Sequence, residues 1–286
     1  MFTELFFICN ASFVSMLTYI LSFDHNMFCV MSTRINGYIA RICGLRVFIY
    51  GDKFDSYEDA LIISNHKTMF DIVSIFYIVG HFNNTIGFCL KKQINSIPGI
   101  GWWCKRMKFP ALERNENDLK LLSQVTRDYQ IVIYPEGTRY TNKNYRNSLD
   151  YALKSGFPIS KYACVPRHRG SFALAKNIIY QMTFVYLDKQ QRIITSEVTE
   201  FPSRIYIHVK RHTNIPKTEP EYKLWLHNQF KNIDDVYDKF EPNNAIEMLP
   251  NFKRNDYIFI GLYVMIHIGI GYFIINRLFG QTVNEL

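Results

Sequence analysis

A histidine and an aspartate separated by four residues, His66 and Asp71, form the sharpest chemical signal in this sequence. His66 follows an apolar strand-like segment, and Asp71 lies at the start of an apolar helix-like one. A histidine can accept a proton near neutral pH, and a carboxylate bonded to its other ring nitrogen fixes its tautomer. The pair could therefore act as a general base on a hydroxyl group. A helix-capping asparagine, a surface histidine and a helix aspartate would also produce this string, because short motifs often match by chance.

Three further segments place arginines beside turns. At Tyr134–Arg139 (YPEGTR), the end of an apolar strand runs into a glycine turn that carries a carboxylate, a hydroxyl and a guanidinium. Phe109–Arg114 (FPALER) ends in an arginine, and Val165–Gly170 (VPRHRG) carries two arginines after Val165 and Pro166. The arginine fork suits phosphate oxygens, and backbone N–H groups near a glycine can add donors. Taken alone, each segment also fits solvated charge beside a turn.

Strand-like and helix-like segments alternate through the middle of the chain. This alternation predicts an α/β domain with a mixed sheet flanked by helices. Catalytic groups in such folds usually follow the ends of strands, as His66 does here. Strands are expected at Leu45–Tyr50, Ala60–Ile63, Phe88–Leu90, Ile131–Tyr134, Ala163–Val165, Ile178–Tyr186 and Arg204–Lys210. Helices are expected at Thr68–Val79, Asn117–Tyr129, Glu221–Phe230 and Asp234–Phe240.

The composition indicates a folded protein with an anionic partner. The chain has 286 residues, 48% of them hydrophobic and 16% aromatic, and a formal net charge of +8. Excess positive charge suits nucleic acid, an acidic membrane surface or a phosphorylated small molecule. No helix-turn-helix, zinc-finger or RNP-like pattern supports nucleic acid. The cysteines at 9, 29, 43, 89, 104 and 164 lack C-x-x-C spacing, so we expect neither a bound metal nor a disulfide framework.

Two apolar segments near the ends predict membrane anchors. Leu5–Phe23 and Tyr257–Ile275 are each long enough to cross a bilayer core of about 30 Å. The first also fits a buried or interfacial helix, because it contains asparagine and serine. Positive charges that flank both segments on the inner side favour a cytosolic middle region. The expected parts are an anchor at 1–24, a catalytic domain at 25–250 and an anchor with its tail at 251–286.

Taken together, the four blocks resemble the glycerophospholipid acyltransferase family, which includes the 1-acylglycerol-3-phosphate acyltransferases. The matching blocks are NHKTMFD, FPALER, EGTR and VPRHRG, in that order. The resemblance also takes in KKQINSIPGIGWW and the segments around HVKR and WLHNQFKNIDDVYDKF, roughly residues 35 to 240. The R-x-R-G form of the last block is similar to the branch that contains lysocardiolipin and lysophosphatidylinositol acyltransferases.

The resemblance implies a function and a set of site residues. It implies transfer of a fatty acyl group from acyl-CoA, as co-substrate, to a lysophospholipid hydroxyl, with no cofactor. His66 would be the base and Asp71 its orienting carboxylate. The substrate-binding residues would be Arg114, Glu136, Gly137, Thr138, Arg139, Pro166 and Arg167. The expected location is the endoplasmic reticulum membrane, with the mitochondrial outer membrane as an alternative.

Two other functions fit the same sequence. A CoA-independent transacylase would take its acyl chain from another phospholipid, and the motifs do not distinguish it. A non-catalytic membrane scaffold could keep the fold, although a scaffold has no need of the base His66. Dependence on acyl-CoA in a purified assay separates the first alternative from the CoA-dependent enzyme.

Overall fold

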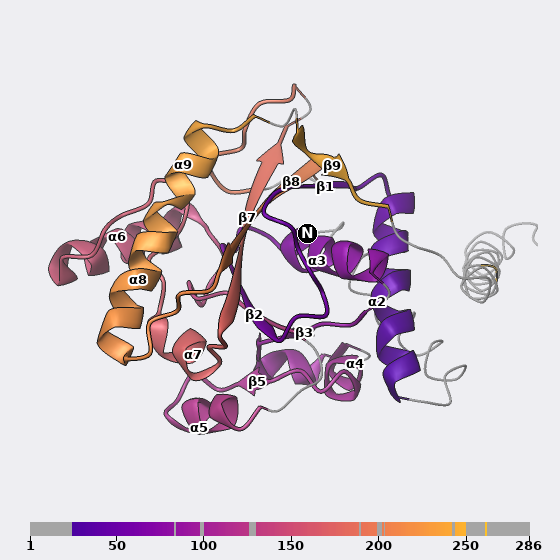
Figure 1. Cartoon of the computed structure of the whole chain (residues 1–286), viewed down its shortest axis with the longest axis horizontal. Coiled ribbons are helices and arrows are strands. Elements are labelled where there is room, and N and C mark those ends of the chain that lie inside the picture. Colours follow the sequence, from indigo (N-terminus) through magenta and orange to yellow (C-terminus); the bar gives the residue numbers. More distant parts are fainter. Residues whose placement is uncertain are drawn as a thin grey trace, which may run out of the picture.

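A mixed sheet of seven strands forms the centre of the molecule (Figure 1). The computed structural model describes residues 25–82, 84–97, 100–125, 130–188, 190–198, 202, 204–241, 244–249 and 261. The strand order is β3-β6-β2-β7-β8-β1-β9. The strands are β1 (Arg46–Gly51), β2 (Ala60–Ser64), β3 (Gly87–Phe88), β6 (Ile131–Ile133), β7 (Ile178–Leu187), β8 (Arg204–His212) and β9 (Ile246–Glu247). The β7–β8 and β1–β9 pairs are antiparallel and the other pairs are parallel.

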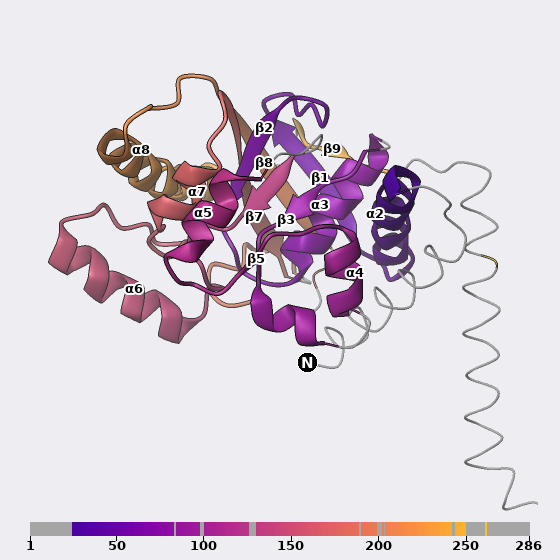
Figure 2. The same cartoon turned by 90° about the horizontal axis from the view of Figure 1, so that it is seen from below.

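Helices cover both faces of this sheet, as the two views show (Figures 1 and 2). One face buries apolar side chains under α2 (His25–Ile42), α3 (Phe70–His81) and α4 (Ile100–Arg106). The other face buries them under α5 (Asn117–Ser123), α8 (Glu219–Lys231) and α9 (Ile233–Asp238). The predicted α/β class and the mixed sheet flanked by helices are therefore confirmed.

The remaining elements lie around one end of the sheet. Figure 2 shows α6 extending from the body of the protein, and only Ala152 of this helix is buried. These elements are β4 (Leu90–Lys91), the 3-10 helix η1 (Lys92–Ser96), β5 (Ala111–Leu112), α6 (Asn142–Ser155) and α7 (His168–Ala173), with β4 paired to β5.

The helix α2 was not predicted from the sequence, and its contact with α3 explains why. Its buried side includes polar residues such as Ser32 and Thr33, which weaken the apolar periodicity. A Cβ at Gly37 would lie 2.9 Å from the Cα of Tyr77, and one at Gly80 would lie 3.1 Å from the Cα of Arg34. The two helix backbones thus meet directly through glycines, and this tertiary contact helps to hold α2 in place.

Parallel pairing brings several chain segments to the same edge of the sheet. In the register, Ile63 of β2 lies beside Ile133 of β6, and Phe88 of β3 lies beside Val132. The residues that follow these strands therefore emerge together at their carboxyl ends. This edge receives the loop with His66, the turn with Glu136 and the strand with Lys91.

One predicted strand, Ala163–Val165, is wrong. These residues form a loop, and the backbone N–H groups of Cys164 and Val165 bond to the side chains of Glu136 (2.9 Å) and Ser148 (2.6 Å). These N–H groups therefore bond to side chains instead of to the backbone carbonyls of a neighbouring strand. The predicted Phe88–Leu90 strand is divided between β3 and β4, and α5 ends at Ser123 rather than at Tyr129.

The two predicted membrane anchors fall on residues that the structure does not describe, apart from Gly261. Among the helices that it does describe, none combines the length and the apolar character needed to cross a membrane.

Candidate active site

The loop that carries His66 is fixed to the neighbouring strand β7. The Ser64 hydroxyl donates to the carbonyl of Met182 at 2.7 Å. The Asn65 side-chain oxygen accepts the backbone N–H of Phe184 at 2.9 Å. Both side chains are buried, so the chain leaves β2 in one defined direction. The residues before His66 thus act as a structural anchor for it.

His66 and Asp71 form the predicted pair. His66 Nδ1 lies 2.8 Å from Asp71 Oδ2, and that oxygen also accepts the backbone N–H groups of Lys67 (2.8 Å) and Thr68 (3.1 Å). Asp71 lies in the first turn of α3, and its side chain is 0% exposed. Burial raises the pKa of Asp71, while the hydrogen bond and the charge of His66 lower it. Because Asp71 accepts the hydrogen of His66 Nδ1, the other ring nitrogen of His66, Nε2, can take a proton.

An aromatic ring fixes the plane of the imidazole. The ring of Tyr134 stacks on His66 with centroids 4.1 Å apart and planes inclined by 20°. Tyr134 directly follows β6, so the parallel β2–β6 pair sets this contact. Burial raises the pKa of Tyr134 well above its usual value, and the charge of Asp71 adds to this effect. The tyrosine is therefore a neutral support for the imidazole.

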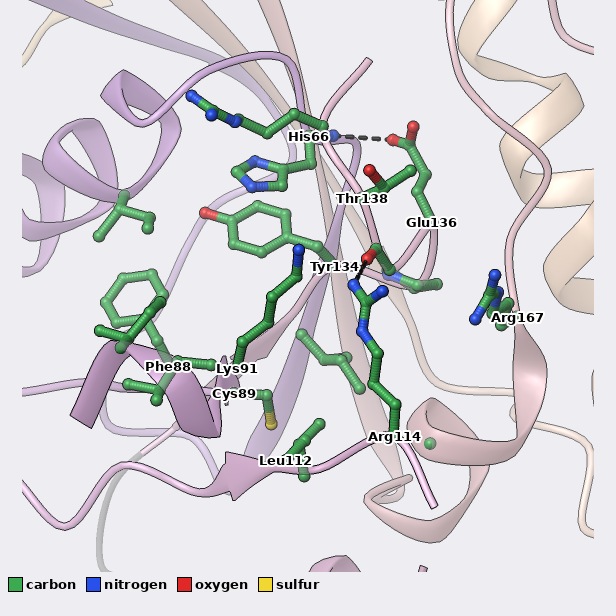
Figure 3. A pocket seen from close by; sticks show the side chains of 18 of the residues that line it. His66, Phe88, Cys89, Lys91, Leu112, Arg114, Tyr134, Glu136, Thr138 and Arg167 are labelled. Atoms are coloured by element: carbon green, nitrogen blue, oxygen red, sulfur yellow. Dashed lines mark hydrogen bonds between the residues drawn. The ribbon is translucent and has the colours of Figure 1, made fainter. Parts of the chain in front are cut away.

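Glu136 connects two backbone segments of the site. Its Oε1 accepts the backbone N–H of His66 at 2.7 Å (Figure 3), and its Oε2 accepts that of Cys164 at 2.9 Å. The residue is 3% exposed, and burial raises its pKa to about 8. The sequence resemblance implied a role in substrate binding, but both carboxyl oxygens are used by the protein backbone. Glu136 thus aligns the His66 loop with the loop around Cys164.

We expect this carboxyl group to give the fold a pH-dependent stability. Its pKa is raised on folding, so the stabilisation is complete below about pH 4.5 and is lost as pH rises through about 8. Glu136→Gln cannot titrate, and its amide places an N–H donor against a backbone donor, which costs about 1–3 kcal/mol. Thermal melts at several pH values should show a steeper decline from pH 5 to 8.5 for the original chain than for the variant. Equal slopes would refute the assignment.

A large cavity opens in front of this pair, with a volume of about 1420 Å³. The lining combines apolar and cationic side chains, and Figure 3 shows Phe88 on one side of the view, Arg114 and Arg167 on the other, and His66 above them. The apolar region, named the apolar arm, is lined by Ile72, Val73, Phe76, Phe88, Ile100, Trp103 and Phe109. The polar region, named the cationic arm, is lined by Lys91, Arg114, Thr138, Arg139, Pro166, Arg167 and Arg169. A ligand with a long apolar chain and a charged head fits this division.

Arg114 of the cationic arm is held in place by the neighbouring glycine turn and by Asp118. Its guanidinium donates to the carbonyl of Gly137, and its backbone has a left-handed φ of 68°. Asp118 holds that backbone by accepting the Arg114 N–H at 2.5 Å. Gly137 also has a positive φ, 66°, and Arg167 Cδ would lie 3.8 Å from a Cβ there. The FPALER, EGTR and VPRHRG blocks are thus in contact around one glycine turn.

Other contacts complete the predicted set. The Arg167 N–H donates to the Pro135 carbonyl at 2.7 Å, which joins the last block to the third. The Thr138 hydroxyl accepts from the Asn144 amide at 2.8 Å. All nine predicted site residues are therefore brought together. Asp71 supports His66 from behind, and the other eight line the cavity.

Sequence reasoning missed Lys91 as a site residue. Figure 3 shows Lys91 and Arg114 both extending toward Tyr134 and His66. Burial lowers the pKa of Lys91, and the charges of Arg114 and Arg139 lower it further. The Lys91-Lys92 pair lies within the KKQINSIPGIGWW segment that was matched. The folded chain distinguishes the two, because Lys91 ends β4 and lines the cavity, whereas Lys92 begins η1 and pairs with Glu113.

Comparison with known proteins identifies related chains. The family model described as Acyltransferase matches residues 46–193. Lysocardiolipin acyltransferase 1 from Mus musculus is 28% identical over 215 residues, which cover 67% of this chain and 57% of that protein. The probable 1-acyl-sn-glycerol-3-phosphate acyltransferase 5 from Arabidopsis thaliana is 27% identical over 233 residues, which cover 73% of this chain and 62% of that protein. The chain thus spans about three-fifths of the length of these relatives.

A solved structure is also similar. It is the 1-acyl-sn-glycerophosphate (LPA) acyltransferase PlsC from Thermotoga maritima, with a TM-score of 0.48 and 15% sequence identity. The alignment covers 80% of this chain and 89% of that one.

Proposed function

Because this chain belongs to the acyltransferase family, we propose that it transfers a fatty acyl group from acyl-CoA to a free hydroxyl of a lysophospholipid. One observation carries the proposal. His66, held by Asp71 behind it, lines a cavity whose wall has both an apolar arm and a cationic arm. A thioester donor and a lysophospholipid acceptor both combine a long hydrocarbon chain with phosphate groups. The two arms match these two chemistries.

In the proposed reaction, the acceptor hydroxyl attacks the thioester carbonyl directly. His66 Nε2 takes the hydroxyl proton as the oxygen–carbon bond forms. The tetrahedral intermediate then collapses, the carbon–sulfur bond breaks, and the CoA thiolate receives the proton from His66. Asp71 stabilises the positive imidazolium between these two steps. The thioester is already an activated donor, so no covalent enzyme intermediate is required.

The cationic arm supplies the proposed phosphate contacts. Lys91, Arg114 and Arg139 all line the cavity, and the pKa of Lys91 is lowered first by partial burial and then by the charges of the two arginines. Such a cluster favours an anionic group over a neutral one. An acceptor phosphate bound there would leave the glycerol hydroxyl near His66. Head groups such as inositol phosphate or cardiolipin-type glycerol phosphate remain candidates within the same class.

We also propose that the terminal segments attach the domain to a membrane with its cavity on the cytosolic side. The endoplasmic reticulum is the proposed location, because the acceptors are membrane lipids. Protease protection of sealed microsomes tests this. Cleavage within the catalytic domain from outside the vesicle supports the proposal, whereas protection would contradict the cytosolic orientation.

The function is tested by supplying the detergent-purified protein with labelled oleoyl-CoA and a panel of acceptors. The panel holds lysophosphatidic acid, lysophosphatidylinositol and lysocardiolipin. A second series replaces oleoyl-CoA with a labelled diacyl phospholipid. Transfer from oleoyl-CoA alone supports the proposal and names the acceptor. Transfer from the phospholipid alone would favour the transacylase, and no transfer from either donor would favour the scaffold.

We expect Lys91→Met to weaken acceptor binding. A charge-assisted contact with a phosphate is worth about 1.5–3 kcal/mol, and Lys91 is exposed, so the lower value applies. The acceptor KM should rise about tenfold with little change in kcat. Lys92→Met is the matched control, because Lys92 is the adjacent residue, pairs with Glu113 and does not line the cavity. Equal effects of the two substitutions on KM would contradict a specific role for Lys91.

A further inference from the structure

The buried carboxylate of Asp71 has a partner on each of its two oxygens. Oδ2 accepts from His66 and from the backbone of Lys67 and Thr68. Oδ1 accepts a hydrogen bond from the hydroxyl of Tyr186. Both Asp71 and Tyr186 are 0% exposed, so water does not replace this donor. The hydroxyl therefore bonds to the oxygen of Asp71 that His66 does not use.

Tyr186 is held firmly in the middle of the sheet. It lies near the carboxyl end of β7 and pairs with Ile205 of β8. Its backbone carbonyl accepts the N–H of Ile194 at 2.8 Å. Strand alternation puts Tyr180 and Tyr186 on the same face of the sheet, in the apolar cluster beneath α3. The tyrosine hydroxyl thus has a fixed position behind the catalytic pair.

We propose that Tyr186 is a positioning residue that acts through Asp71: its hydroxyl keeps the carboxylate ionised and oriented toward His66. Tyr186 lies outside the four sequence blocks and does not line the cavity. The inference rests on the proposed function, because it assigns a role within the same reaction. It extends the pair to a buried chain of tyrosine, aspartate and histidine.

Several other titratable groups surround Asp71, and their contributions differ in kind. Lys67 donates its backbone N–H to Asp71, and the charges of the two side chains attract each other. The ammonium group itself bonds elsewhere, to the carbonyls of residues 194, 195 and 196 at 3.2–3.4 Å. Burial lowers the pKa of Lys67 to about 8, and it raises that of Glu136 to about 8. The surrounding groups are His66, Lys67, Tyr134, Glu136 and Tyr237. Tyr186 is distinct from Tyr134, Glu136 and Tyr237 because its side chain donates directly to the carboxylate.

Removal of the Tyr186 hydroxyl should shift the pH dependence of the reaction in one direction. An O–H bond to a carboxylate stabilises the ionised form. Without it, the unpaired charge on Asp71 is less well stabilised, so a proton shared between Asp71 and His66 is held more tightly. The unprotonated base then requires a higher pH. Tyr186→Phe should therefore move the acidic limb of the pH profile of kcat/KM upward by about one pH unit.

The experiment compares the original 286-residue chain with its Tyr186→Phe and Tyr180→Phe variants in detergent. Tyr180 is the matched control because it is a fully buried tyrosine on the same strand and face. Its hydroxyl bonds to Glu58 and Asp55 at the opposite end of β7, away from the cavity. An upward shift of the acidic limb in Tyr186→Phe alone supports the inference. Identical pH profiles, or a loss of the same size at every pH, would overturn it.

A second measurement does not depend on catalysis. The imidazole of His66 can be titrated by NMR in protein with labelled histidine, with its signal assigned by the loss in His66→Ala. The titration midpoint should rise by about one pH unit in Tyr186→Phe and stay constant in Tyr180→Phe. An unchanged midpoint would refute the role of Tyr186. If the original chain transfers no acyl group but the midpoint moves, the proposed function fails while the hydrogen-bonded chain stands.

Discussion

His66→Ala should lower kcat by about 10²–10⁴-fold, because it removes the general base. The imidazole is the group that faces the cavity, and Asp71 leaves its Nε2 free to accept a proton. No neighbouring side chain can substitute easily, since Tyr134 has a pKa well above its usual value and Glu136 is bound by two backbone N–H groups. Acceptor KM should change little, because the cationic arm is intact. Steady-state assays with oleoyl-CoA and the preferred acceptor provide the measurement.

His81→Ala is the matched control for this experiment. His81 lies at the end of the same helix that carries Asp71, contacts the Leu249 carbonyl and does not line the cavity. Its replacement should leave kcat within a factor of two or so, while thermal melts verify that both variants fold. If His66→Ala folds and retains most of the original kcat, His66 is not the base.

Asp71→Asn should also reduce kcat by about 10²–10⁴-fold, through a different cause. The N–H groups of Lys67 and Thr68 should keep the amide oxygen at the position of Oδ2, so the bond from His66 Nδ1 can persist. The neutral amide cannot stabilise the imidazolium that forms when His66 takes the proton. The orientation of the base is then retained and its charge stabilisation is lost. We expect a large change in kcat and a small change in acceptor KM.

Asp234→Asn separates the loss of this charge from a general loss of stability. Asp234 is buried, accepts from Ser160 at 2.7 Å and from the Lys161 N–H at 2.8 Å, and lies outside the cavity lining. Its replacement should lower the melting temperature and leave kcat nearly unchanged. Equal kcat losses in the two aspartate variants would indicate that Asp71 acts through stability rather than through His66.

The sequence predicted the composition of the site better than the roles within it. A strand end followed by a histidine and an aspartate pointed to His66 and Asp71, and the resemblance of the ordered blocks to a known family named the arginines. Glu136 was assigned to substrate from its motif, but its two oxygens bond to backbone N–H groups that only the folded chain brings near. Tyr186 carried no local signal, since its partner Asp71 lies 115 residues away in the sequence.

The fold was predictable where periodicity was strong and failed where tertiary contacts decide the conformation. The central strands β2, β7 and β8 were recognised from apolar and β-branched residues. The helix α2 was missed because glycines and polar residues form its contact with α3. The helix α6 was also missed, since only Ala152 is buried and its sequence has no long apolar stripe.

The central claim is that an acceptor hydroxyl, activated by His66, attacks an acyl-CoA thioester directly. Its most direct test follows free CoA thiol and acylated lipid together during incubation of the purified 286-residue chain with oleoyl-CoA. We predict one CoA released for each lipid acylated, no release without acceptor, and loss of both products in His66→Ala. Acylation of the lipid without CoA release, or equal release in His66→Ala, would contradict the claim.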